Sequence, residues 1–131
     1  MDAKRHIKGD GKYEEALPHL VNWWNFWKFP VPPITSLPLN MIVIYNKDIP
    51  LAAGFIYQTD SDIAWLEWIV ASHTAKKEER SKALDLLIDS GKVAAQMLGH
   101  SVVFTCSKNQ SLSHRLKRTM IHADDGVSHF V

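Results

Sequence analysis

The pattern of hydrophobic and polar positions is most regular between residues 63 and 99. Ile63–Val70 consists of β-branched and aromatic residues with a single charge, which is typical of a central strand buried on both faces. A polar link follows, and apolar residues then recur at helical spacing on one face of Ser81–Gly99, where Gly99 is a stop signal. The apolar face consists of Leu84, Leu87, Ile88, Gly91, Ala94, Ala95 and Leu98. We therefore predict that one strand and one amphipathic helix form the centre of the fold.

The segments before this unit predict a helix and a stiff connector. Apolar side chains keep helical spacing across Tyr13–Trp27, although Pro18 lies in the early part of that range. Lys28–Asn40 holds four prolines and is expected to run extended. Trp23 and Phe26 fall outside the main apolar stripe of the helix. They either pack into a small core or form an aromatic wall for an acceptor substrate.

A strand pattern follows this region, whereas the first residues of the chain have none. Met41–Asn46 and Pro50–Gln58 predict a β-hairpin, and Gly54 predicts a bulge or a close backbone approach in its second strand. Met1–Lys12 shows no periodicity. We expect it to be a flexible arm or a short leading strand, followed by one domain that spans residues 13–131.

The C-terminal third continues the alternation of strands and helices. Ser101–Cys106 is predicted to be a strand parallel to Ile63–Val70, because the predicted helix connects the two. Ser107–Thr119 has helical spacing and predicts a short helix. The chain is then expected to close as a hairpin around Asp125 and Gly126.

Composition limits the classes of protein that fit. The chain has 131 residues, of which 46% are hydrophobic and 22% are charged, and this suits one globular domain with a single core. A formal net charge of +1 argues against a protein held to nucleic acid by bulk charge. Cys106 is the one cysteine, which excludes an internal disulfide and a cysteine-built metal site. Without a secretory signal or an apolar run of membrane length, the chain is expected to work in the cytoplasm.

Metal binding is not predicted, so the metal-ligand prediction is none. The seven histidines are scattered and show no ligand spacing. Asp60 and Asp62 are paired carboxylates, but no further ligand lies within reach in the sequence. Turn formation explains them better.

The start of the predicted long helix is the candidate binding site. Lys76–Ser81 is polar, and a helix start presents unpaired N–H groups at a positive dipole end. These features suit an anion such as a pyrophosphate. Lys and Arg also outnumber acidic residues between Asp89 and Asp124, where no acidic residue occurs. That excess is either a solvated face or a surface that meets phosphates.

The order helix, hairpin, strand, helix, strand, short helix, hairpin resembles the GNAT superfamily of acyl-CoA-dependent N-acyltransferases, and more narrowly its short phage-encoded branch. The resemblance covers roughly Tyr13 to Val131. It is carried by the segments PLAAGFIYQTD, AWLEWIVASH and ERSKALDLLIDSGKVAAQMLGHSVVFTC. It implies a single α/β domain with a mixed twisted sheet flanked by helices and a central β-α-β unit that binds acyl-CoA.

The resemblance also implies positions for the cofactor. The pyrophosphate motif of the superfamily, Q/R-x-x-G-x-G/A, aligns with Lys76–Ser81, where the basic first position matches and Glu79 and Ser81 replace the two small residues. A glycine there lets the backbone approach the pyrophosphate. Direct pairing of phosphates with Arg80, Lys76 and Lys77 is expected to compensate for its absence. The implied cofactor-binding residues are Ile69, Val70, Lys76, Lys77, Glu79, Arg80, Ser81 and Asn109.

Catalysis in this superfamily often uses a glutamate on the central strand as the base. Glu67 is the only ionisable residue in Ile63–Val70, and desolvation between two tryptophans would raise its pKa toward neutrality. The opposing interpretation is that Glu67 faces solvent. The usual acid of the superfamily, a tyrosine, falls on Leu116 when Asn109 is taken as the asparagine of its last helix. Nearby substitutes for the acid are Cys106, Ser107 and His114.

The resemblance therefore implies transfer of an acyl group, in particular the acetyl group of acetyl-CoA, to an amine whose identity the sequence does not give. Two alternatives stay open. One is a GNAT-like protein without catalysis that acts as an interaction module. The other is an acyltransferase directed to nucleic acid. No membrane partner is expected, a homodimer is left open, and a phage-encoded protein would work in the host cytoplasm.

Overall fold

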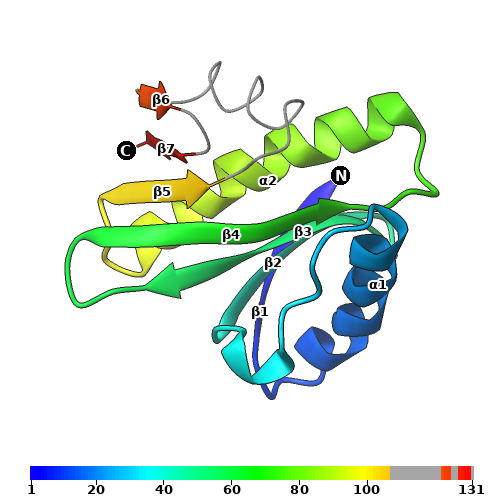
Figure 1. Cartoon of the computed structure of the whole chain (residues 1–131), viewed down its shortest axis with the longest axis horizontal. Coiled ribbons are helices and arrows are strands. Elements are labelled where there is room, and N and C mark those ends of the chain that lie inside the picture. The colour runs from blue at the N-terminus through cyan, green and yellow to red at the C-terminus, as the bar shows by residue number, and fades with distance from the viewer. Residues whose placement is uncertain (107–121, 125–126, 131) are drawn as a thin grey trace.

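A mixed sheet in the strand order β1-β2-β3-β4-β5-β7-β6 forms the middle layer of the fold (Figure 1). The computed structural model describes residues 1–106, 122–124 and 127–130. The strands are β1 (Asp2–Ile7), β2 (Asn40–Asn46), β3 (Ile49–Gln58), β4 (Ile63–Ala71), β5 (Val102–Cys106), β6 (His122–Asp124) and β7 (Val127–Phe130). The helices are α1 (Lys12–Phe26), α2 (Lys77–Met97) and the short 3₁₀ helix η1 (Ile34–Ser36).

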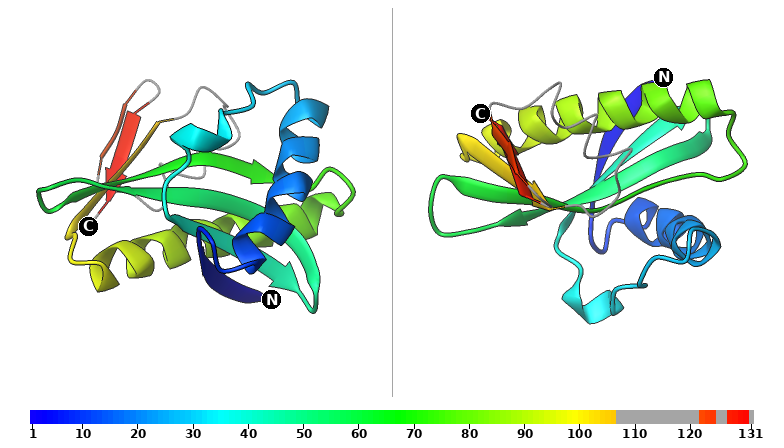
Figure 2. Two further views of the ribbon diagram at one scale, coloured as in Figure 1. Left: turned by 90° about the horizontal axis from the view of Figure 1, so that it is seen from below. Right: turned by 45° about the horizontal axis from the view of Figure 1, so that its top comes forward.

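Helices α1 and α2 cover opposite faces of this sheet (Figure 2). Each helix packs against its own hydrophobic cluster, and alternate residues of β2, β3 and β4 point into one cluster or the other. The cluster under α2 includes Leu66, Leu87 and Ile88, whereas the cluster under α1 includes Trp24 and Phe55. The fold is therefore a single α/β domain with three layers, and the predicted fold class is confirmed.

The predicted elements of the first hundred residues are found within a few residues of their expected bounds. The hairpin is present as β2 and β3, which pair antiparallel. Strands β4 and β5 pair parallel on either side of α2, as the predicted β-α-β unit requires. The expected stop is also present, because Gly99 has a φ of 95° and its N–H donates to the carbonyl of Gln96.

The close contact between α2 and β4 depends on the absence of a side chain at Gly91. A Cβ at this position would lie 2.9 Å from Cδ2 of Leu66, which is fully buried. The glycine in the apolar face therefore lets the helix backbone approach the strand. No helix in the described residues is long and apolar enough to cross a membrane.

Two expectations drawn from the sequence are wrong. The segment 63–70 is not buried on both faces: Ala64 and Leu66 are buried, but Trp65 and Glu67, which alternate with them, are only half-buried. The reason is that α1 lies over the other end of β4, so that its cluster includes Val70 but not Trp65. The proline-rich connector is not extended throughout, because its middle forms η1.

The terminal segments give further outcomes. Of the two alternatives for the N-terminal segment, the structure has the strand, since β1 pairs with β2 along its whole length. The closing hairpin is confirmed by the antiparallel pairing of β6 and β7, in which Asp124 lies opposite Val127. The short helix predicted for Ser107–Thr119 lies outside the described residues.

His6 makes the stability of the fold depend on pH. His6 is a buried residue of β1, and its Nε2 lies 2.8 Å from the hydroxyl of Tyr45 on β2. Burial lowers the pKa of His6 from its ordinary value of 6.5. The unfolded chain therefore binds a proton at a higher pH than the folded chain, so the free energy of unfolding should fall as the pH drops below about 6.5.

This prediction can be measured by urea unfolding of the protein and of His6→Gln between pH 7.5 and pH 5. We expect the stability difference between the two proteins to shrink as the pH falls. A difference that stays constant over this range would show that His6 does not titrate differently in the folded state.

Candidate functional site

The candidate base, Glu67, lies in the middle of β4 on the face that α1 partly covers. It is directly opposite Phe55 of β3, which belongs to the α1 cluster, and opposed residues of antiparallel strands share a face. The residue as a whole is half-buried. The structure therefore places Glu67 at the border between the aromatic core under α1 and the more open part of the sheet.

A bulge follows immediately after Glu67. In the register of β3 and β4, Ala53 lies opposite Val70 and Phe55 lies opposite Glu67, so two residues, Trp68 and Ile69, share the place opposite Gly54. An extra residue in one strand bends it and leaves a backbone group outside the ladder. Of the two alternatives for Gly54, the structure has a bulge, but the extra residue lies on β4 and not on the strand of Gly54.

Gly54 lies in close packing at this bulge. A Cβ at residue 54 would lie 3.3 Å from both Cγ1 of Ile69 and Cδ1 of Leu66, which is tighter than ordinary side-chain contact. Trp68 has a φ of 58°, in the left-handed region that bulky residues rarely adopt. The backbone of β4 is thus turned away from regular strand geometry next to the candidate base.

Strands β4 and β5 separate just before the bulge. Their parallel register consists of three pairs. The last pair is Trp65 with Phe104, and the centres of the two rings are 5.3 Å apart. From Leu66 onward, β4 has no pair with β5 in the described residues. Strands β4 and β5 therefore part just before Glu67.

The helix start expected to bind an anion follows β4 closely in the chain, because β4 ends at Ala71 and α2 begins at Lys77. Lys76 is the N-cap residue of α2 and its side chain makes no capping hydrogen bond. The first backbone bond of the helix joins the N–H of Arg80 to the carbonyl of Lys76, so the three preceding N–H groups lie in the unpaired first turn. Lys76 and Lys77 are exposed at this position.

Two charged residues of this first turn point away from it. The Glu79 carboxylate accepts a hydrogen bond of 2.9 Å from Nδ2 of Asn46, at the end of β2. Arg80 donates a hydrogen bond of 2.6 Å to the carbonyl of Ala75, and its guanidinium lies 5.5 Å from the centre of the Trp27 ring. In this structure Arg80 therefore braces the loop before α2, and its contact with a phosphate stays a prediction.

An aromatic cluster fastens the end of α1 to the segment that joins β4 and α2. Nε1 of Trp27 donates a hydrogen bond of 2.8 Å to the carbonyl of Ala71. The rings of Phe26 and His73 stack at 3.9 Å with an angle of 9° between their planes. Trp23 is buried, which supports its interpretation as a core residue, whereas 54% of the Phe26 surface is exposed.

Sequence reasoning did not find several residues that shape this region. Asn46 and Tyr57 belong to the hairpin and had no motif that pointed to the site. Trp27 was assigned only to the apolar face of a helix. The left-handed φ of Trp68 has no sequence signal either. Gly54 pointed to a bulge, but it lies on the opposite strand and does not indicate which residue of β4 is affected. The register of β3 with β4, together with the side-chain bonds of Trp27 and Asn46, brings these residues into the region.

The remaining predicted site residues lie partly in the C-terminal segment and partly on β4 and α2. Asn109, Ser107, His114 and Leu116 lie outside the described residues, and Cys106 is the last residue of β5. Ile69 and Val70 lie at and just after the bulge, and Ser81 is half-buried in the first turns of α2. The residues that the structure describes contain no group of three potential metal ligands.

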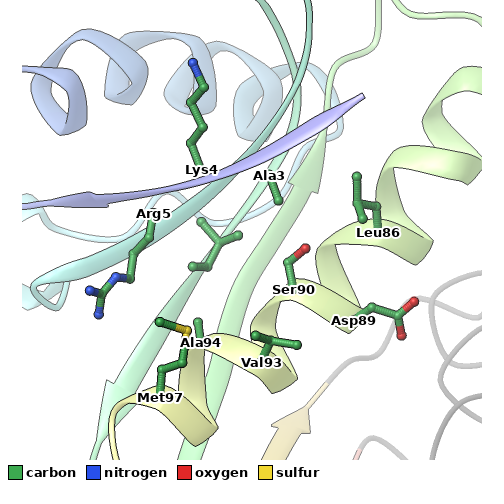
Figure 3. A pocket seen from close by; sticks show the side chains of 10 residues that line it. Ala3, Lys4, Arg5, Leu86, Asp89, Ser90, Val93, Ala94 and Met97 are labelled. Carbon is green, nitrogen blue, oxygen red and sulfur yellow. The ribbon is translucent and has the colours of Figure 1, made fainter.

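A groove of about 400 Å³ lies at the other edge of the sheet, between β1 and α2 (Figure 3). Arg5 and Ala3 of β1 line one side, and Ser90, Val93 and Met97 of α2 line the other. Strands β2 and β3 lie between β1, which lines this groove, and β4, which carries Glu67. The groove is therefore remote from Glu67.

No protein-family model and no curated protein sequence matches the chain. Solved structures do match it over nearly its whole length. Escherichia coli ElaA is 12% identical with a TM-score of 0.71 over 99% of both chains. An acyl-CoA N-acyltransferase from Pseudomonas aeruginosa is 10% identical with a TM-score of 0.68 over the whole of both chains.

A third similar structure contains a ligand. Rv2747 from Mycobacterium tuberculosis, in complex with CoA and NLQ, is 11% identical with a TM-score of 0.68 over 93% of this chain and 74% of that chain. The TM-scores establish the fold, whereas sequence identities this low do not carry the activity of these proteins over to this chain. The chain has the fold of acyl-CoA N-acyltransferases.

Proposed function

We propose that the chain is an acyl-CoA-dependent N-acyltransferase that moves an acetyl group from acetyl-CoA to an amine. The observation that carries the proposal is the bulge at Trp68, which lies between the separation of β4 from β5 and the uncapped start of α2. The likeness of the whole fold to N-acyltransferases supports the same function.

The chain offers groups that fit each part of an acyl-CoA molecule. The unpaired N–H groups at the start of α2, with Lys76 and Lys77 beside them, suit the pyrophosphate. The carboxylate of Glu79 is held by Asn46, so it is not drawn back over the amides of its own helix start. From Leu66 onward the described residues show no pairing of β4 with β5, and this edge of β4 suits the amide groups of an extended pantetheine arm.

Acetyl-CoA supplies the activated acyl group as a thioester. Glu67 accepts the proton that the amine loses as its nitrogen attacks the carbonyl carbon, and the carbon–sulfur bond breaks to release the thiolate. Backbone amides near Ile69 and Val70 stabilise the negative charge on the carbonyl oxygen. The bulge turns this stretch of backbone out of the regular ladder, which makes such an amide accessible.

Binding of acetyl-CoA tests the proposal directly. At a concentration one hundred times its Kd, acetyl-CoA should raise the free energy of unfolding by about 2.7 kcal/mol, which a thermal shift assay detects. Lys77→Glu should weaken binding by about an order of magnitude, because it puts a like charge beside the pyrophosphate. Isothermal titration gives the Kd of each variant.

Lys12→Glu is the matched control, since it makes the same change of charge at the far end of α1. It should leave the Kd unchanged. Absence of any thermal shift at millimolar acetyl-CoA would contradict the proposed function and favour an interaction module instead. The resemblance to the phage-encoded branch and direction of the activity to nucleic acid stay predictions.

A further inference from the structure

Trp68 has a backbone conformation that its residue type disfavours. Its φ of 58° lies in the left-handed region, where a bulky side chain meets the neighbouring backbone. In the described part of the chain, Lys28 and Lys47 are the other non-glycine residues with positive φ, and both lie outside regular elements. Trp68 is unusual because it lies inside a strand, so something must hold it in this conformation.

The side chain of Trp68 is fixed by two neighbours on the α1 face of the sheet. Its Nε1 donates a hydrogen bond of 2.8 Å to the hydroxyl of Tyr57. Its ring meets the buried ring of Trp24 edge-on, with 6.3 Å between the ring centres. These contacts fix the indole in two directions, and Gly54 on the facing strand leaves room for the extra residue.

The hydrogen bond of Trp68 continues to the proline-rich connector. The hydroxyl of Tyr57 donates a bond of 2.9 Å to the carbonyl of Ser36, the last residue of η1. A carbonyl can only accept and an indole N–H can only donate, so the one hydroxyl proton of Tyr57 is committed to Ser36 and its oxygen receives the indole N–H. The direction of this chain of bonds is therefore fixed.

We infer that Trp68 is a positioning residue that holds the β4 bulge in its productive shape, and that Tyr57 couples this bulge to the connector at Ser36. The inference rests on the proposed acyl transfer, because it assigns the shape of the bulge a role in placing the backbone amides near Ile69 and Val70. Backbone strain that persists next to reacting groups needs neighbours that over-determine it. The two contacts and the hydrogen-bond chain supply them.

The test uses Trp68→Phe, which keeps a ring but removes the N–H, and Tyr57→Phe, which removes only the hydroxyl. Each variant should lower kcat by about 10- to 100-fold, the scale of a small misplacement of reacting groups. The KM for acetyl-CoA should change by less than about twofold, because the start of α2 is untouched. The double variant should be no slower than the worse single variant, because both changes break the same chain of bonds.

Two matched variants separate positioning from a general loss of packing. Tyr13→Phe removes a hydroxyl that donates a bond of 2.7 Å to the carbonyl of Pro38, in the same connector but away from the bulge. Trp23→Phe makes the same aromatic replacement at a buried site of α1. Neither control should change kcat by more than about twofold. Equal kcat values for the test and control variants would overturn the inference.

Amide hydrogen exchange measured by NMR gives a readout that does not need activity. In Trp68→Phe, the amides of Ile69 and Val70 should exchange faster than in Trp23→Phe, because the bulge is less firmly held. Unchanged exchange at these amides would overturn the positioning role. Faster exchange in a protein that neither binds nor uses acetyl-CoA would support the positioning of the bulge while contradicting the proposed function.

Discussion

Glu67→Gln is expected to lower the rate of acyl transfer by about 10²- to 10⁴-fold, the usual scale for removal of a general base. Glutamine keeps the shape of the side chain but cannot take up a proton at this position. Glu67 is the one titratable side chain of β4, and it lies next to the bulge whose amides are proposed to meet the thioester carbonyl. The fold and the affinity for acetyl-CoA should stay as in the unchanged protein.

The pH dependence of this variant makes the prediction specific. An amine must be neutral to attack, so the loss in Glu67→Gln should be greatest at low pH and should shrink as a rising pH deprotonates the amine without help. Rates with any accepted amine, measured from about pH 6 to about pH 9.5, test this. Asp62→Asn is a suitable control, because it neutralises a carboxylate just before β4, outside the site. Full activity of Glu67→Gln throughout would remove this residue from the mechanism.

Trp24→Ala is expected to lower the free energy of unfolding by about 3–5 kcal/mol. The Trp24 side chain is 1% exposed at the centre of the α1 cluster, where its ring stacks on Phe55 and meets Trp68 edge-on. Truncation removes these contacts and leaves a cavity that rigid neighbouring strands cannot fill. Unfolding in urea, followed by circular dichroism, measures the loss.

Phe26→Ala is the matched control for this prediction. Phe26 lies two residues further along the same helix but is 54% exposed, so its truncation should cost no more than about 1 kcal/mol. If Trp24→Ala does not fold, Trp24→Phe gives a smaller cavity and a loss that can be measured. A loss for Trp24→Ala as small as that for Phe26→Ala would show that the cluster under α1 is not a tightly packed core.

These two predictions depend on opposite properties of β4. Its buried residues join the two cores, while half-buried Glu67 lies where the core gives way to a more open face. The bulge makes both possible on one short strand, because an inserted residue changes which side chains face α1. The contact of Trp24 with Trp68 then links the stability of the α1 cluster to the shape of the site.

Local patterns in the sequence were sufficient to predict most of the elements. Helical spacing identified α1 and α2, β-branched runs identified β2 to β5, and Gly99 marked a helix end, because each of these signals acts between residues close in the chain. Gly54 even indicated the bulge. The order of these elements was enough to suggest the fold class.

Tertiary structure alone decided how the candidate site is arranged. Glu79 turns toward Asn46, Arg80 lies against Trp27, and the extra residue of the bulge is Trp68 on the strand opposite Gly54. None of these follows from local spacing, because each depends on the register between strands or on packing between segments that are far apart in the chain. Side-chain direction at a site is set by the partners that the fold brings near, and the sequence lists those partners without their positions.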